Sequence, residues 1–204
     1  MTTTATALDE LLRGARVWRG GERARIEAAA TGAARLDEFL PGGGWPVGAL
    51  TEILLDTAGI GELGLVLPHL ARVTQAGGRA AFAGPPHLPF APALAQAGVV
   101  LPRVVMVRPA SAGAALWAAE QMLRSGAFGT VLAWPGKVHE RDLRRLQLAA
   151  ETGHAIGFLF RDAREARHAS PAALRLRLAR TPQGLQVDVL KCRGGSPGRL
   201  RVAA

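Results

Sequence analysis

The sequence alternates between short, almost uninterrupted apolar runs and longer segments with helical periodicity, and this alternation restricts the fold more than any other feature. The apolar runs cover 49–55, 79–84, 103–109, 128–134 and 154–160. Between them, apolar residues recur every three or four positions, which is the spacing of an amphipathic helix. Parallel strands have this composition because helices cover both of their faces. The sequence therefore predicts an α/β fold with a mostly parallel twisted sheet flanked by helices.

The segments between and after these runs indicate helices and a hairpin. Residues 174–180 and 185–191 alternate apolar and polar side chains around the turn sequence TPQG, which predicts a C-terminal antiparallel hairpin. Ser111 is a residue type favoured at the start of a helix. The expected helices cover 62–78, 89–99, 111–126 and 138–153.

The first 30 residues differ from the rest of the chain. Residues 8–18 have helical spacing, and the polar stretch GGERARIEA separates them from the apolar runs. We expect an N-terminal helical arm and linker over 1–30 and a core domain over 31–204. The apolar face of the arm either binds a groove on a partner or packs on the core of its own chain. The residues of this face are Leu8, Leu11, Leu12 and Trp18.

Several classes of site and location are not expected. Cys192 is the only cysteine, which excludes a disulfide framework and a cysteine-based zinc site, and the histidines lack the spacing of metal ligands. The N-terminus lacks the pattern of a secretory signal, and no window approaches about 20 uncharged apolar residues. We therefore expect a cytoplasmic protein with no metal and no membrane partner.

Positive charge is concentrated in the last third of the chain. The formal net charge is +9, and residues 141–204 hold 13 basic and 5 acidic side chains, a net charge of +8. This asymmetry indicates a polyanion or an acidic protein surface as a partner. The alternative is an arginine-rich genomic composition, because Lys137 and Lys191 are the only lysines.

The stretch LLDTAGIGEL lies where the first core strand turns into a helix, and ligands of such folds bind beyond the carboxyl ends of the strands. A phosphate-binding loop reads G-x-x-x-x-G-K-[ST]. With Gly61 as its second glycine, Asp56 stands in place of the first. Glu62 then replaces the lysine and Leu63 the hydroxyl residue, although Gly59 keeps the loop glycine-rich. Glu62 would repel a triphosphate, so we expect a degenerate nucleotide loop without catalysis or cofactor, the alternative being a weak ATPase.

Three stretches resemble RecA recombinases. TGAARLDEFLPGGGWPVGALTEI (31–53) is similar to the segment that leads into their ATP loop. Residues 81–99 and 124–134 resemble the stretches that carry their catalytic glutamate and their Walker B aspartate. The resemblance implies a RecA-like core and places Pro86 and Trp134 at those two positions. Neither residue can activate water or hold magnesium, so the resemblance implies a non-catalytic protein.

Within that superfamily the chain resembles the ImuA family of RecA-like accessory proteins from bacterial mutagenesis cassettes. The matching stretches are 40–68, 131–136, 143–151 and 190–195. This resemblance implies a role in SOS-induced translesion DNA synthesis, with RecA, ImuB and an error-prone C-family DNA polymerase as partners. Some such proteins are described as SulA-like, which implies the alternative of a cell-division inhibitor that binds a tubulin-like GTPase.

Basic residues follow the last expected strand. In RecA filaments, two basic residues at the places of Lys191 and Arg193 reach the neighbour's ATP. The resemblance therefore implies that this pair caps the ATP of an adjacent RecA protomer in trans. The alternative is a pair of solvated charges at a strand end, and a homo-oligomer also stays open.

The segment RDAREARHASP stands where RecA has a mobile DNA-binding loop. Arg161, Arg164 and Arg167 can contact the phosphates of single-stranded DNA. Asp162 and Glu165 weaken the positive field, and the absence of an aromatic residue removes a base-stacking platform. The alternative is a solvated helical turn.

Two tryptophans carry further expectations. Trp45 lies in a glycine-rich loop and is expected at the surface. Trp134 is expected to line the nucleotide pocket and to fill the space that magnesium and phosphate occupy in RecA.

Overall fold

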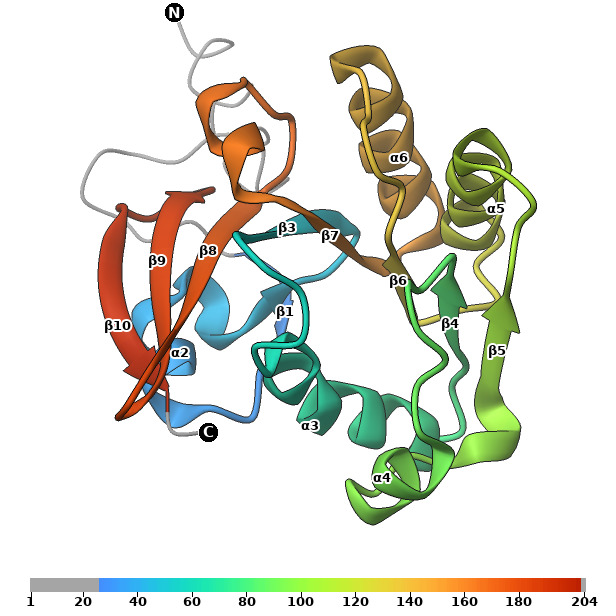
Figure 1. Ribbon diagram of the computed structural model, residues 1–204, viewed down its shortest axis with the longest axis horizontal. Coiled ribbons are helices and arrows are strands. Elements are labelled where there is room, and N and C mark those ends of the chain that lie inside the picture. The colour runs from blue at the N-terminus through green and yellow to red at the C-terminus, as the bar shows by residue number, and fades with distance from the viewer. Residues whose placement is uncertain (1–25, 203–204) are drawn as a thin grey trace, which may run out of the picture.

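An eight-stranded sheet runs through the computed structural model, which describes residues 26–202 (Figure 1). Its strands are β3 (Ala49–Leu55), β4 (Ala80–Ala83), β5 (Val104–Val107), β6 (Thr130–Ala133), β7 (Ile156–Asp162), β8 (Leu174–Thr181), β9 (Gly184–Cys192) and β10 (Gly198–Val202). Their order is β10-β9-β8-β3-β7-β6-β4-β5. The strands from β8 to β5 are parallel, whereas β9 is antiparallel to both neighbours. The predicted fold class is confirmed.

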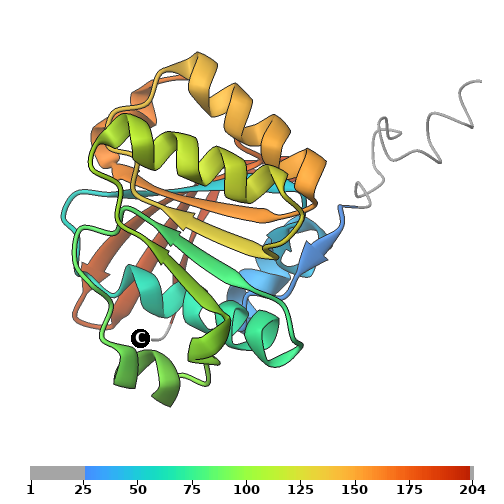
Figure 2. The ribbon, with the colours of Figure 1, turned by 90° about the vertical axis from the view of Figure 1, so that its right-hand side faces the viewer.

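Helices cover both faces of the sheet (Figure 2). On one face α5 and α6 pack on each other and on β3, β4 and β6, and on the other face lie α2, α3 and α4. All four predicted helices are present, each shorter than expected at one or both ends, and Ser111 caps α5 by accepting from the Ala114 N–H at 3.2 Å. The helices are α2 (Ala34–Phe39), α3 (Glu62–Gln75), α4 (Ala91–Gln96), α5 (Ala112–Arg124), α6 (Glu140–Gly153) and the 3₁₀ turns η1 (Pro41–Gly43), η2 (Leu101–Arg103) and η3 (Ala163–Arg167).

The C-terminal hairpin has a third strand that the sequence interpretation missed. Strand β10 pairs antiparallel with β9, with Leu200 opposite Val187 and Val202 opposite Leu185. Its side chains alternate between charged and apolar, but the run is five residues long and follows a Gly-Gly-Ser-Pro turn, which is a weak signal. The edge of the sheet is therefore one strand further from the centre than expected.

A two-stranded sheet precedes the main one. Strand β1 (Ala28–Ala29) pairs antiparallel with β2 (Trp45–Pro46). Strand β1 lies within the segment assigned to the arm and linker, so part of that linker is ordered against the core. The predicted arm helix over 8–18 lies outside the described residues, and the predicted domain boundary at residue 31 stays a prediction.

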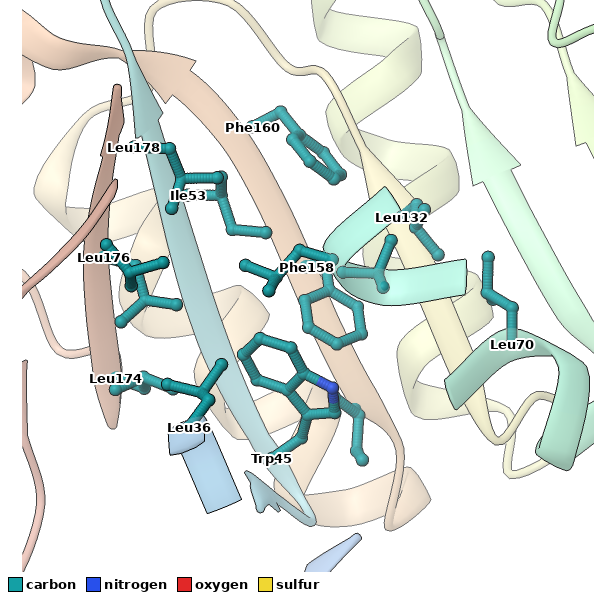
Figure 3. Packing of buried hydrophobic residues seen from close by; sticks show 14 of the residues in the cluster. Leu36, Trp45, Ile53, Leu70, Leu132, Phe158, Phe160, Leu174, Leu176 and Leu178 are labelled. Carbon is teal, nitrogen blue, oxygen red and sulfur yellow. The ribbon is translucent and has the colours of Figure 1, made fainter. Parts of the chain in front are cut away.

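Trp45 is buried, and its expected position at the surface is wrong. Its exposed fraction is 0%, and its ring meets Phe158 edge to face with a centroid distance of 5.0 Å (Figure 3). The glycines before it explain the error. A Cβ on Gly44 would lie 2.1 Å from the Ala29 carbonyl oxygen, so only glycine lets the loop approach β1 closely enough to turn the indole inward.

Replacing Trp45 by alanine should destabilise the protein by about 3–5 kcal/mol, because it removes a large buried ring and leaves a cavity. Chemical unfolding followed by circular dichroism measures this change. Trp117→Ala is the matched control, because that ring is 62% exposed and its loss should alter the free energy of unfolding by about 0.5 kcal/mol or less. Equal effects of the two substitutions would contradict the inward placement.

His69 is a buried titratable group in α3. Its Nε2 lies 2.7 Å from the Thr130 hydroxyl oxygen, and its exposed fraction is 3%. Burial, aided by the nearby positive charge of Arg72, lowers the pKa of His69 from 6.5 to about 4. The native state therefore keeps this imidazole neutral at pH values where the unfolded chain protonates it.

Stability should consequently fall as the pH drops from 6.5 toward 4, since in that window the unfolded state binds the proton of His69 and the native state does not. The loss attributable to this group approaches about 3 kcal/mol at pH 4. Urea unfolding of the wild type and of His69→Gln at pH 7, 6, 5 and 4 measures it. The difference between the two proteins should shift by this amount, and a pH-independent difference would exclude the depressed pKa.

Candidate functional site

The loop between β3 and α3 lies at the carboxyl end of the central strand, where ligands of parallel α/β sheets bind. Gly59 and Gly61 have φ values of 83° and 100°, which favour glycine, and α3 begins directly after Gly61. The backbone thus has the glycine-dependent turn into a helix that nucleotide loops use. What differs is the set of side chains around it.

The Glu62 side chain places a negative charge inside the loop. Its Oε1 accepts a hydrogen bond from the Gly59 N–H at 3.0 Å, and the residue is buried. The carboxylate lies in the first turn of α3, where the helix dipole favours an anion. A loop amide that would donate to a phosphate oxygen therefore already has an internal acceptor.

Asp56 is bound by an arginine of the C-terminal hairpin. Its two carboxylate oxygens accept from Arg177 Nη2 at 3.1 and 2.8 Å, and this hydrogen bond with its opposite charge raises the pKa of Arg177. Arg177 pairs across strands with Asp188, which in turn binds Arg199 of β10. A ladder of alternating charges thus runs from the loop to the sheet edge. Asp56, Arg177 and Arg199 are largely exposed, so each pair contributes little stability on its own.

A cleft of about 630 Å³ opens beside the loop, between the carboxyl ends of β3, β6 and β7. Trp134 lines it and stacks on Phe160 with a centroid distance of 4.5 Å and on Phe82 at 6.0 Å. The indole thus occupies the end of β6, where a Walker B aspartate would stand. Pro86 is exposed on the loop after β4 and does not line the cleft, so the structure brings together Asp56 and Trp134 but not Pro86.

A buried ion network lies beneath this cleft, and sequence reasoning missed it. Glu52, at the middle of β3, has an exposed fraction of 0%. Its carboxylate accepts from Arg161 Nη1 of β7 and, at 2.5 Å, from Arg175 Nε of β8. Arg161 also donates to Glu165 at 2.9 Å, which balances the four charges. A glutamate inside the apolar run ALTEILL was the available signal, because a buried carboxylate requires a charged partner.

The proposed phosphate contact of Arg161 is therefore incorrect. Its side chain is 2% exposed and is committed to Glu52, Glu165 and the Val138 carbonyl oxygen. Arg164 and Arg167 remain exposed on η3. Arg164 binds Asp162, and this hydrogen bond lowers the pKa of Asp162 to about 2. Part of the expected positive field is thus neutralised within the turn itself.

Arg175 holds the segment that follows β7. Its Nη2 donates to the Glu165 carbonyl oxygen at 2.9 Å, and its Nη1 donates to the carbonyl oxygens of His168 at 2.9 Å and Ala166 at 3.4 Å. The Glu52 carboxylate fixes this guanidinium from the opposite side. The segment that stands in place of RecA's mobile loop is therefore tied to the buried network.

Glu52→Gln should destabilise the protein by about 3–5 kcal/mol, because it leaves two buried guanidinium groups without their shared counter-ion. Urea unfolding measures the loss, and trypsin should cleave the native variant faster after Arg164 and Arg167. Asp188→Asn breaks a pair whose arginine is 69% exposed and should cost at most about 1 kcal/mol. Unchanged stability and cleavage in Glu52→Gln would show that the network does not hold this segment.

Lys191 and Arg193 lie away from the nucleotide loop. Strand β9 is antiparallel to β8, and Lys191 is paired with Arg175 near the start of β8, whereas the loop follows the end of β3. Lys191 Nζ donates to the Ser170 carbonyl oxygen at 2.7 Å, and partial burial together with the charges of Arg175 and Arg193 lowers its pKa. This pair therefore cannot contact a nucleotide at the loop of its own chain.

The predicted arm residues Leu8, Leu11, Leu12 and Trp18 lie outside the described part of the chain.

Within residues 26–202, the side chains of His, Cys, Asp and Glu form no group of three or more that could hold a metal ion. In the same range, every helix is too short or too polar to cross a membrane.

Among known proteins, the chain is similar to RecA and to the cell division inhibitor SulA. A family model described as the RecA N-terminal domain matches residues 11–134. The chain is 40% identical over 73 residues to the cell division inhibitor SulA of Edwardsiella piscicida. The aligned residues make up 36% of this chain and 44% of that protein. The chain is 35% identical over 118 residues to the protein RecA of Crocosphaera subtropica, covering 57% of this chain and 33% of that protein. For SulA of Yersinia enterocolitica the identity is 35% over 72 residues, or 35% and 43% of the two chains. The chain thus spans less than half the length of these relatives.

Proposed function

The chain belongs to the RecA N-terminal domain family, and from this premise we propose that it is a non-catalytic member that acts through protein contacts. Its proposed role is that of an accessory subunit in SOS-induced translesion DNA synthesis, bridging RecA and a complex of ImuB with an error-prone C-family DNA polymerase. The observation that carries the proposal is the hydrogen bond that the Glu62 carboxylate accepts from the Gly59 N–H inside the loop.

The absence of catalysis is supported by three substitutions that act independently. Glu62 places negative charge where the triphosphate needs positive charge. Asp56 replaces a glycine and is bound by Arg177. Trp134 replaces a metal-binding carboxylate by an indole that stacks on Phe160. Each removes a different requirement of ATP hydrolysis, namely charge neutralisation, loop backbone and metal binding. A protein that keeps the sheet but loses all three is better suited to binding than to chemistry.

The proposed contact with RecA uses Lys191 and Arg193. Both residues are exposed and lie at the end of the sheet that is remote from the chain's own loop. In the proposed contact, Lys191 Nζ exchanges its hydrogen bond to the Ser170 carbonyl oxygen for one to the neighbour's phosphates. Two cations can cap the ATP phosphates of an adjacent protomer in trans, as an arginine finger does. The N-terminal arm would supply a second contact, and Arg164 and Arg167 are the remaining proposed contacts with single-stranded DNA.

A pull-down with RecA assembled on single-stranded DNA tests this role. The purified protein should bind when ATP is present and lose binding in Lys191→Ala/Arg193→Ala. The matched control is Arg141→Ala/Arg144→Ala on the exposed face of α6, which removes the same amount of charge and should leave binding intact. Binding that survives the first double substitution would move the contact to the arm. No binding to RecA in any state would contradict the bridging role.

The second candidate function is inhibition of cell division. It is favoured by the 40% identity with SulA of Edwardsiella piscicida, which is named a cell division inhibitor. In that case the protein would bind a tubulin-like GTPase and slow its assembly. Light scattering of the assembling GTPase, with and without this protein, separates the two candidates, because the translesion role predicts no effect.

A further inference from the structure

A groove beside α2 has no role in the function proposed above. It consists of two adjoining hollows of about 690 and 310 Å³, which share Gly32, Ala33 and Val202. The groove lies between the start of α2, the first turn of α3 and the ends of the C-terminal strands, a region where the views in Figures 1 and 2 place these elements together. We call it the α2 groove.

The smaller hollow is lined mainly by aliphatic side chains. Leu65 and Leu185 belong to the buried core, and the other apolar lining residues larger than alanine come from the nucleotide loop, α3 and β10. These other residues are Ile60, Pro68 and Val202. A hollow of this size and lining fits a large apolar side chain. No aromatic residue lines either hollow, so a nucleic-acid base would find no stacking surface.

The rim of the groove carries only positive charge. Arg35, Arg180 and Arg201 line it, and all three are exposed. Neither hollow has an acidic lining residue, and within residues 26–202 none of these three arginines forms an ion pair. This contrasts with Arg164, Arg177 and Arg199, which are each bound to a carboxylate. Three guanidinium groups around an apolar hollow are complementary to carboxylates that flank an apolar side chain.

We propose that the α2 groove binds an acidic peptide segment of a partner protein. One apolar side chain of the segment enters the hollow beside Leu65 and Leu185, and Asp or Glu residues on either side of it bind Arg35, Arg180 and Arg201. Arginine suits this task because its planar guanidinium binds a carboxylate through two parallel hydrogen bonds. The proposal does not depend on the translesion role, because the groove is separate from Lys191 and Arg193.

Gly64 offers a substitution that blocks the groove without disturbing the fold. It lies in α3, lines the smaller hollow, and a Cβ placed on it would meet no atom within 4 Å. Leucine also has a higher helix propensity than glycine, so Gly64→Leu should fold at least as well as the wild type. Gly113→Leu in α5 is the matched control, since Gly113 is an exposed helical glycine remote from the groove.

The test is a selection from a displayed library of random twelve-residue peptides on the full-length protein, with depletion on Gly64→Leu. The expected consensus is one large apolar residue flanked by Asp or Glu. A synthetic consensus peptide should bind Gly113→Leu as it binds the wild type. Its affinity should fall at least about tenfold for Gly64→Leu and for Arg180→Ala/Arg201→Ala, and should weaken with added salt.

Three outcomes would overturn the proposal. The first is the absence of any peptide that distinguishes the wild type from Gly64→Leu. The second is a consensus without acidic residues, which would exclude the role of the arginines. The third is an acidic peptide that binds Gly64→Leu as tightly as the wild type, which would place its site elsewhere on the basic surface.

Discussion

The Glu52 carboxylate is the interaction on which the rest of the structure depends. A carboxylate with an exposed fraction of 0% needs compensation, and it receives this from Arg161 on one neighbouring strand and Arg175 on the other. The two contacts therefore require β7 and β8 to flank β3 in a fixed register, so that one arginine of each strand reaches Glu52. Because Arg175 also binds three carbonyl groups after β7, the same carboxylate sets the position of the segment between β7 and β8.

The loop after β3 in this RecA-family chain has the expected glycine-dependent backbone, but its carboxylates are bound within the chain. Glu62 accepts a hydrogen bond from a backbone N–H of the loop, Asp56 forms an ion pair with Arg177, and Trp134 stacks on Phe160. The negative charges at the loop thus have partners within the chain. A phosphate would have to displace one carboxylate and approach a second, both of which repel it. A RecA-like sheet thus carries a loop whose carboxylates already have partners within the chain.

The regular core could be predicted from the sequence because its strands and helices are encoded by local patterns. The run ALTEILL gives β3 with the predicted bounds, and the helical period gives α3 and α6. The features that were missed depend on contacts between distant residues. Glu52 is 109 residues from Arg161 and 123 from Arg175, and the inward turn of Trp45 depends on the approach of Gly44 to Ala29. Periodicity identified Arg161 as a cation after a strand, but only the fold reveals that its charge is buried.

The most direct test of the self-occupied nucleotide loop is a calorimetric titration of the wild-type protein with ATP and magnesium at about 0.1 M salt. If Glu62 and Trp134 occupy the places of phosphate and metal, no saturable binding should be detected up to about 1 mM nucleotide, a concentration at which even weak sites begin to fill. Saturable binding of one ATP per chain would contradict this, and turnover of the bound ATP would require the protein to be regarded as an enzyme.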